Sequence, residues 1–343
     1  MKSSASVAPS ADLIRPPDGP DVRRVSIVVP VYQGELTLGA LIDEIVPLTL
    51  LQHTPQGRAF RVTDVILVND GAIDNSTSVM REIASKHALV TPLWLSRNFG
   101  QHPATLAGMA SSTGDWVVTL DEDGQYDPTD IGAMMDNAEE NGAQLVYAFP
   151  LNPPPHGWWR NSGSVAVKTI GRYLAGSSDV GHFSSFRLIR GEIARSLAAY
   201  CGQGVYLDVA LSWVVGKSSL QPVMFRAERG RTSGYTFRRL VAHFWRFILT
   251  AGTRPLRIIA ILGSSSIVAA VCIGAYAIWQ KLAHSVPIQG WTSLVIVISF
   301  FSGLILFSLG VIAEYLALTL TMAMGKPLYL IVSGQDNSKT PPR

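Results

Sequence analysis

The first half of the chain repeats one pattern, a short apolar run followed by a segment whose apolar residues have helical spacing. Five such runs predict strands: Val25–Val31, Val62–Val68, Leu93–Ser96, Trp116–Leu120 and Leu145–Phe149. A strand that lacks polar alternation is buried on both faces, as in a parallel sheet. Strands that alternate with helices predict βαβ units with right-handed crossovers. We therefore expect an α/β domain in which the loops that follow the strands meet at one edge of the sheet.

Polar residues follow these predicted strands and should gather at that edge. They are Tyr32 and Glu35, Asp70, Arg97, and Asp121 with Asp123. In open α/β sheets, ligands bind in the crevice beyond the carboxyl ends of the strands. The pattern thus places charged side chains where a ligand is expected.

The most informative stretch is the acidic cluster after the fourth predicted strand, Asp121-Glu-Asp123-Gly-Gln125-Tyr-Asp127-Pro128. Two carboxylates spaced i and i+2 can turn toward one ligand where the strand gives way to a turn. Mg²⁺ is usually held by one or two carboxylates, and substrate phosphates and water complete its shell. The cluster therefore predicts a divalent cation and a substrate that carries a diphosphate. The alternative is a solvated acidic turn in which Asp127 and Pro128 start the next helix, because short motifs often match by chance.

The regular alternation ends near Pro150, and Asn152–Pro155 marks a boundary inside the domain. Beyond it the pattern predicts a helix at Trp158–Leu174, a strand at Ser185–Ile189, helices at Glu192–Ala199 and Val205–Val215, and a strand at Leu220–Phe225. We expect this second half to form the acceptor side of the site, where the second substrate binds.

Two long apolar segments follow, Ile258–Gln280 and Ser285–Ala313, and neither contains a charged residue. Each is longer than the ~20 apolar residues that a membrane-spanning helix needs. A buried core helix is the alternative, but two adjacent runs of this length argue against it. We predict transmembrane helices at residues 256–281 and 290–317.

Basic residues around these segments predict the orientation. Arg246, Arg254 and Arg257 precede the first segment, Lys326 follows the second, and Lys281 is the only one between them. Cationic flanks stay in the cytoplasm. We therefore expect a cytosolic domain over residues 23–235 and a cytoplasmic tail over residues 318–343.

Residues 236–255 have an amphipathic pattern. One stripe is apolar, and a second is basic and polar: Leu240, Phe244, Phe247, Ile248 and Ala251 against Arg239, His243, Arg246 and Thr250. This pattern is typical of a helix in the membrane interface, and an amphipathic helix on a soluble core is the alternative. Residues 1–22 are rich in Ser, Ala, Pro and Asp and lack the apolar core of a signal peptide, so we expect a disordered leader.

Composition narrows the function. The net charge of +3 is too small to indicate nucleic-acid binding. Cys201 and Cys272 lie in different regions, which argues against a disulfide and fits a reducing cytosol. The chain has no G-x-G-x-x-G and no G-x-x-x-x-G-K-[ST], which counts against nicotinamide cofactors and P-loop phosphoryl transfer.

Eight blocks in order resemble the membrane-bound family 2 glycosyltransferases: VSIVVPVY, LVNDGAIDNS, LSRNFGQHPATLAG, GDWVVTLDEDGQYDP, SSFRLIRG, SGYTFRRL, RPLRIIAILG and AEYL…GKPLYLIV. The resemblance covers about Val25 to Leu330. Enzymes of this kind move a sugar from a nucleotide diphosphate to a polyprenyl phosphate. The resemblance implies a nucleotide-sugar-binding, glycosyltransferase A-type (Rossmann-like) domain, followed by an interfacial amphipathic helix and two transmembrane helices.

The resemblance also implies roles for single residues. Asp121, Asp123 and Gln125 would surround Mg²⁺ or Mn²⁺, and the donor site would be formed by Pro30, Tyr32, Glu35, Asp70, Arg97 and Asp121. The acceptor phosphate would be held by Arg229, Arg231 and Ser233, near Arg226, Arg254 and Arg257. Arginine suits phosphate because its fork binds bidentately, but the block departs from the family's Arg-x-x-Gly-x-Ser, which leaves open which arginine makes the contact.

The catalytic base is a second departure. The family often places an aspartate directly before its Phe-Arg-Leu block, and this chain has Ser185 there. Asp208 begins a helical pattern in the acceptor half, where the positive helix end would keep it ionised and ready to accept a proton. We assign Asp208 and Asp123 as catalytic residues. A simple helix cap at Asp208 is the alternative, as is a lipid phosphate that attacks without a protein base.

The expected function is inverting, metal-dependent transfer of a sugar from a nucleotide sugar to a polyprenyl phosphate at the cytoplasmic membrane face, for cell-envelope glycan or lipid A modification. The expected partners are these two substrates, the bilayer and a second copy of the chain. The alternatives are transfer to another lipid, a polymerising synthase and a non-catalytic scaffold. A synthase should carry Q-x-x-R-W and more spans, and a scaffold should have lost the acids, whereas Asp121 and Asp123 are intact.

Overall fold

The computed structural model describes residues 22–152, 183–202, 204–226, 254–284 and 290–333. Within them one sheet has the strand order β8-β6-β7-β5-β1-β3-β4-β9, and β2 pairs with β3. The strands are β1 (Arg23–Val31), β2 (Gln52–His53), β3 (Ala59–Asn69), β4 (Val90–Leu95), β5 (Trp116–Thr119), β6 (Leu145–Pro150), β7 (Arg187–Arg190), β8 (Ser218–Val223) and β9 (Ile331–Val332). The expected leader, the helix at residues 158–174 and the interfacial helix at residues 236–255 lie outside the described residues, except for Val22 and the end of the interfacial segment.

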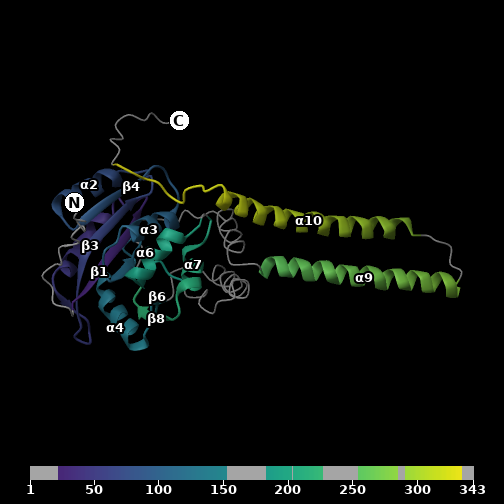
Figure 1. Cartoon of the computed structure of the whole chain (residues 1–343), viewed down its shortest axis with the longest axis horizontal. Helices are drawn as coiled ribbons and strands as arrows, with labels where there is room; N and C mark the ends of the chain where they lie inside the picture. Colours follow the sequence, from purple (N-terminus) through teal and green to yellow (C-terminus); the bar gives the residue numbers. More distant parts are fainter. Residues whose placement is uncertain (1–21, 153–182, 203, 227–253, 285–289, 334–343) are drawn as a thin grey trace, which may run out of the picture.

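Helices cover both faces of this sheet, as Figure 1 shows. They are α1 (Leu38–Ile45), α2 (Ser76–Lys86), α3 (Gln101–Ala110), α4 (Ile131–Asn141), α6 (Gly191–Tyr200) and α7 (Leu207–Val214), with 3₁₀ turns at η1 (Val46–Thr49) and η2 (Pro128–Asp130). One buried cluster contains side chains of α1, α2 and α4, and the other contains side chains of α3, α6 and α7. Successive side chains of a strand point to opposite faces, so Ile27 joins the first cluster and Val28 the second. This explains why the predicted strands read as unbroken apolar runs.

The centre of the sheet is parallel, as predicted, because β5, β1, β3 and β4 all run in one direction. The second half is mixed, because β7 runs antiparallel to both β5 and β6. The Thr119 hydroxyl at the end of β5 donates to the Ser185 carbonyl at 2.6 Å. The chain therefore enters β7 from the edge where β5 ends and must run back along it. A pattern of alternating strands and helices does not reveal this reversal.

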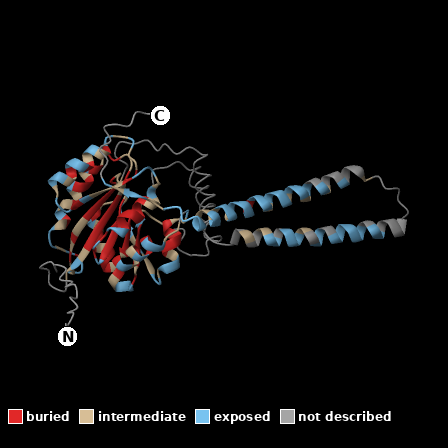
Figure 2. Cartoon of the chain, turned by 45° about the horizontal axis from the view of Figure 1, so that its top comes forward, coloured by how far each residue is buried: buried red, intermediate tan, exposed pale blue. Residues whose placement is uncertain are grey.

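Two long helices, α9 (Arg254–His284) and α10 (Trp291–Ala323), run side by side away from the sheet (Figure 1). The segments Ile259–Tyr276 and Phe300–Ala323 are long and apolar enough to cross a membrane. Figure 2 shows the contrast with the domain: buried residues gather in the sheet and on the inner faces of its helices, whereas α9 and α10 are largely exposed. Exposed apolar surface of this extent is typical of contact with lipid or another protein.

The chain returns to the domain after α10. Ile331 and Val332 form β9, which pairs antiparallel with Leu95 and Trp94 of β4. The Ser96 N–H donates to the Leu330 carbonyl at 2.9 Å. The strand covers an edge of the sheet that would otherwise present unpaired backbone groups. The sequence pattern did not predict it, since two residues carry no periodicity.

Candidate active site

The loops after β1, β3, β4 and β5 meet at the carboxyl edge of the parallel strands. Tyr32, after β1, contacts Glu122, after β5. Asp70, after β3, contacts Phe99 and Gly100, after β4. Segments far apart in the sequence are thereby joined into one cluster.

Asp70 ties two of these loops together. Its buried carboxylate accepts hydrogen bonds from the Phe99 N–H at 2.7 Å and the Gly100 N–H at 2.8 Å. Gly71 permits the close approach, because it has a positive φ of 67° and a Cβ there would lie 2.7 Å from the Asn98 nitrogen. Burial raises the pKa of Asp70, and this effect outweighs the two N–H donors, which lower it.

Glu122 fastens the acidic cluster to β1. Its two carboxylate oxygens accept hydrogen bonds from the Tyr32 N–H and the Gln33 N–H, each at 2.9 Å. The sequence alone indicates no role for Glu122, because its carboxylate has the same chemistry as those of the neighbouring Asp121 and Asp123. Its clamp fixes the backbone on which Asp121 and Asp123 stand.

Asp121 lies directly beyond β5 and is half-buried. Its Oδ1 accepts a hydrogen bond at 2.5 Å from Nε2 of Gln101, in the first turn of α3. Burial raises the pKa of Asp121, while hydrogen bonds from Ser185 and Gln101 and the charge of Arg187 act in the opposite direction. A bound cation would favour the ionised carboxylate in the same way as these cationic and donor groups.

Asp123 and Gln125 belong to the turn that follows. The Gln125 N–H donates to Oδ1 of Asp123 at 3.0 Å across Gly124, whose φ is +68°. The Gln125 carbonyl accepts a hydrogen bond from the Arg226 N–H at 2.9 Å. The main chain of Gln125 therefore connects the acidic turn with the second half of the domain.

The other predicted donor residues surround the same edge. Pro30 lies in β1 opposite Val68. Glu35 is exposed, and its carboxylate accepts from the Asn75 N–H at 3.2 Å. The guanidinium of Arg97 lies 4.2 Å from the ring centre of Phe99.

Asp208 is the second residue of α7 and forms a buried ion pair with Arg187 of β7. Oδ1 accepts from Arg187 Nε at 2.6 Å and from the Tyr147 hydroxyl at 3.1 Å, and Oδ2 accepts from Arg187 Nη2 at 2.9 Å. Burial acts to lower the pKa of Arg187, but the charge and hydrogen bonds of Asp208, together with Tyr147 and Asp121, raise it. The N-cap residue of α7 is Tyr206, whose side chain makes no capping hydrogen bond, and the hydrogen bonds described for the Asp208 carboxylate go to Arg187 and Tyr147. The sequence signal for the partner was an arginine inside an apolar strand, in the block SSFRLIRG.

Arg229, Arg231 and Ser233, the predicted acceptor residues, lie outside the described residues. Arg226 is described, and its guanidinium binds two carboxylates, those of Glu44 at 2.8 Å and Asp127. Arg226 thus joins the acidic turn to α1.

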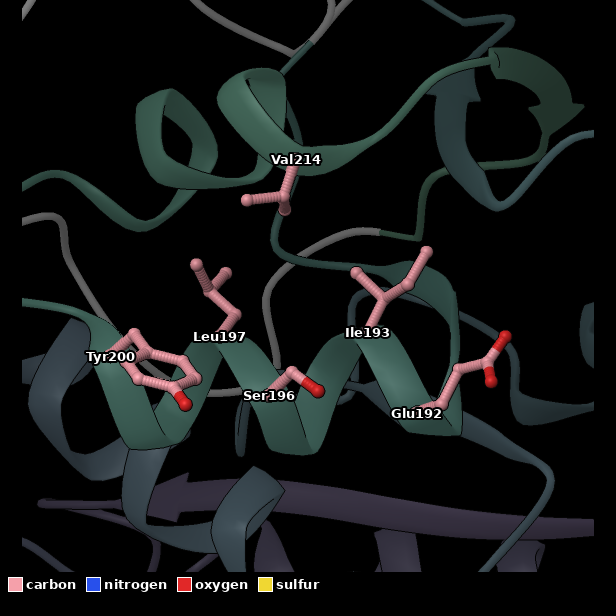
Figure 3. Close-up of a pocket in the computed structure, with 6 residues that line it drawn as sticks. All are labelled: Glu192, Ile193, Ser196, Leu197, Tyr200 and Val214. Carbon is pink, nitrogen blue, oxygen red and sulfur yellow. The ribbon is translucent and has the colours of Figure 1, made fainter.

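Two hollows in the described part of the chain are lined by residues of the second half of the domain. One, of about 180 Å³, is lined by Gln101, His102, Thr105, Asp121, Phe183, Ser184, Ser185, Arg187, Tyr206 and Asp208. It brings together Asp121, predicted for donor and metal binding, and Asp208, predicted as catalytic. The other, of about 310 Å³, is a mostly apolar groove between α6 and α7, lined by Glu192, Ile193, Ser196, Leu197, Tyr200 and Val214 (Figure 3). None of the predicted site residues lines this second hollow.

The donor set at the acidic turn fits a hard divalent cation. Asp121 and Asp123 offer carboxylate oxygens, whereas both oxygens of Glu122 accept from backbone N–H groups. Among the described residues there is no group of three or more His, Cys, Asp or Glu that could hold a metal by themselves. Two carboxylates are the protein share that Mg²⁺ usually receives when substrate phosphate completes its shell.

Comparison with known proteins finds a matching family and relatives that share most of the chain. Residues 26–196 match the sequence model of the family described as Glycosyl transferase family 2. A relative named undecaprenyl-phosphate 4-deoxy-4-formamido-L-arabinose transferase, from Pectobacterium carotovorum, is 27% identical over 91% of this chain and 93% of its own length. The prophage bactoprenol glucosyl transferase homolog of Escherichia coli is 26% identical over 90% of this chain and 98% of its own length.

Among solved structures, glucosyl-3-phosphoglycerate synthase from Mycobacterium tuberculosis, in complex with Mn²⁺ and UDP-glucose, is similar to this chain with a TM-score of 0.46. It is 22% identical, and the similarity covers 66% of this chain and 77% of that chain.

Proposed function

This chain carries a family 2 glycosyltransferase domain, and we propose that it transfers a sugar from a nucleoside diphosphate to the phosphate of a polyprenol. One observation carries the proposal: the acidic turn at Asp121 and Asp123 lies at the carboxyl edge of the sheet, in a chain that matches relatives named for polyprenyl-phosphate substrates over about nine-tenths of its length.

The donor side of the site is the cluster of loops at that edge. Glu122 joins the loops after β1 and β5, and Asp70 joins those after β3 and β4, in each case through backbone N–H groups. These contacts would orient the nucleoside pocket. Asp121 and Asp123 would hold Mg²⁺ or Mn²⁺ against the donor diphosphate. When bound there, the cation would neutralise the charge that develops on the leaving group.

The reaction is a single displacement. A phosphate oxygen of the lipid attacks the anomeric carbon, the bond from that carbon to the diphosphate breaks, and the anomeric configuration inverts. The acceptor phosphate is already anionic, so it can attack without losing a proton. Arg229, Arg231 and Ser233 are the proposed contacts for this phosphate.

The two apolar helices support a membrane location for the acceptor. We propose that α9 and α10 cross the cytoplasmic membrane of a bacterium and that the domain stays on the cytoplasmic side, which is supported by the arginines before the apolar segment of α9. Cysteine labelling tests this topology. Ser285→Cys should react with an impermeant reagent from outside the cell, whereas Ser3→Cys should react only after permeabilisation, and the reverse pattern would reject the topology.

A panel of radiolabelled nucleotide sugars tests the reaction. Membranes that contain the chain are incubated with each donor, Mn²⁺ and added undecaprenyl phosphate, with Asp123→Ala membranes as the matched control. We expect label in a lipid product that depends on one donor, on the polyprenyl phosphate and on the metal. Label that enters lipid without added polyprenyl phosphate would favour the alternative, transfer to another membrane lipid.

A further inference from the structure

Arg187 and Asp208 are buried charged side chains beside the proposed metal site. Their side chains are only 6% and 3% exposed, respectively, and two hydrogen bonds of 2.6 and 2.9 Å join them. Buried charges are strongly unfavourable unless they are paired and hydrogen-bonded. The pair is therefore a unit, and the loss of either partner leaves the other charge uncompensated.

The remaining arm of Arg187 reaches toward the metal site. Nη1 donates to the Thr119 hydroxyl at 3.1 Å and to the Ser185 carbonyl at 3.4 Å. Ser185 in turn donates to the carboxylate of Asp121, and the positive charge of Arg187 acts on that carboxylate through space. Asp121, Arg187 and Asp208 line the same hollow.

We propose that Asp208 is a positioning residue: it neutralises and orients Arg187, which keeps the Asp121 carboxylate available to a divalent cation. The inference rests on the proposed function only in that Asp121 and Asp123 bind the cation. It replaces the role of general base that the sequence suggested for Asp208.

The contacts of Asp208 favour this role over proton transfer. Its two oxygens accept three hydrogen bonds, one from the Tyr147 hydroxyl and two from Nε and Nη2 of Arg187. A general base needs an oxygen within reach of the proton that it removes. The proposed acceptor is a phosphate anion, which presents no such proton.

The consequence of losing Asp208 follows from Arg187. Without its partner the guanidinium remains buried, and Asp121 is the carboxylate in the same hollow on which its charge already acts. Arg187 would then pair with Asp121 and compete with the cation for it.

Mn²⁺ binding to the full chain in detergent, measured by electron paramagnetic resonance, tests this inference. We expect Asp208→Asn to raise the Mn²⁺ dissociation constant by ~10- to 100-fold, the range found when groups that orient metal ligands are removed. The double variant Asp208→Asn with Arg187→Met should return to within a few-fold of wild type, because it lacks the competing cation. Transfer by Asp208→Asn should recover at high Mn²⁺.

The opposite result would support the role of Asp208 as a general base. Unchanged Mn²⁺ affinity in Asp208→Asn, or a loss of transfer that neither Mn²⁺ nor Arg187→Met relieves, overturns the positioning role. If Asp208→Asn alone fails to fold, the double variant still decides, since positioning predicts transfer close to wild type and a base predicts its loss.

Asp136→Asn is the matched control. Asp136 is also a buried carboxylate paired with an arginine, Arg58, but it lies on α4, which packs on the other face of the sheet. We expect it to leave Mn²⁺ affinity unchanged. A wild-type chain that binds Mn²⁺ but transfers no sugar to polyprenyl phosphate would reject the proposed reaction, while the Mn²⁺ comparison would still test the role of Asp208.

Discussion

The carboxyl edge of the sheet and the parts of the domain away from it hold their carboxylates in different ways. At that edge, Asp70 and Glu122 accept hydrogen bonds from four backbone N–H groups. Away from it, Arg24 binds Asp115 and Arg58 binds Asp136. Backbone amides fix a carboxylate without adding an opposite charge, whereas an arginine cancels the charge that it fixes.

This difference means that the loops at the carboxyl edge are held in place without loss of the negative charge there. The edge that would receive a cation keeps its negative charge, because the acids that brace it are held by neutral donors. The arginine pairs join separate elements, as Arg226 does between α1 and η2. The comparison predicts large effects where charge is removed from the edge and small ones at ion pairs elsewhere.

The largest effect is expected at the edge itself. Asp123→Ala should lower transfer by on the order of 10²- to 10³-fold, the loss found when one group that stabilises developing charge is removed. Labelled lipid product measures it, with Glu82→Ala as the control, since Glu82 is an exposed residue that pairs with Lys86 in a surface contact. Full activity of Asp123→Ala, or of the wild type in EDTA, would remove the metal from the mechanism.

Glu122→Gln tests whether activity depends on the two hydrogen bonds that the Glu122 carboxylate accepts from backbone N–H groups. A carbonyl oxygen can still accept from one of the Tyr32 and Gln33 N–H groups, but the amide NH₂ would face the other, and the acidic turn should shift. We expect transfer to fall by ~10- to 100-fold with weaker Mn²⁺ binding. Unchanged kinetics would mean that Asp121 and Asp123 keep their positions without the clamp.

Asp70→Asn likewise replaces a carboxylate by an amide, here at the residue that joins the loops after β3 and β4. One buried donor would lose its acceptor, which lowers the free energy of unfolding by ~1–3 kcal/mol. The KM for the nucleotide sugar should rise by a similar free energy, about tenfold, with kcat less affected. Thermal unfolding and donor titrations measure the two effects, and a fall in kcat alone would place Asp70 outside the donor pocket.

The smallest effect is expected at Asp115, which pairs with Arg24 at the opposite edge of the sheet. Partial burial acts against it, but the hydrogen bonds from Arg24 lower the pKa of Asp115. The stabilisation should therefore be complete above the ordinary Asp pKa of ~3.9 and be lost as the pH falls through the lowered value. Asp115→Asn should cost at most ~1 kcal/mol near pH 7, cost less in acid, and leave transfer unchanged. Denaturant unfolding near pH 7 and in acid measures the loss of stability in Asp115→Asn. A larger loss in acid than near pH 7 would contradict a stabilising pair between Arg24 and ionised Asp115.

The sequence predicted the edge but not the contacts within it. The unbroken run Val25–Val31 and the polar residues after each strand were sufficient to place Tyr32, Asp70 and Asp121 together, because parallel strands end on one side. Which acid braces and which faces a ligand could not be predicted, because that depends on which loop approaches it. Glu122 differs from Asp121 only in the partners that the fold provides.

The pairing of Asp208 was hidden for a related reason. Its partner Arg187 lies in a strand that enters the sheet in the reverse direction, which brings it beneath α7. A carboxylate at the start of a helix suggested a base or a cap, since both interpretations consider only its own element. The arginine inside an apolar strand was the available clue, because a buried arginine requires an anion.

The strand β9 limits how the catalytic domain can move. The domain is connected to the helical hairpin twice, through the chain before α9 and through Ile331 and Val332 after α10. A single tether would allow the domain to swivel about the axis of one helix, whereas two tethers remove most of that rotation. If α9 and α10 are anchored in a bilayer as proposed, the loop after β4 keeps a constant distance from the lipid surface and a constant orientation relative to it. An acceptor that diffuses in the plane of the membrane would then meet an active site that already faces it.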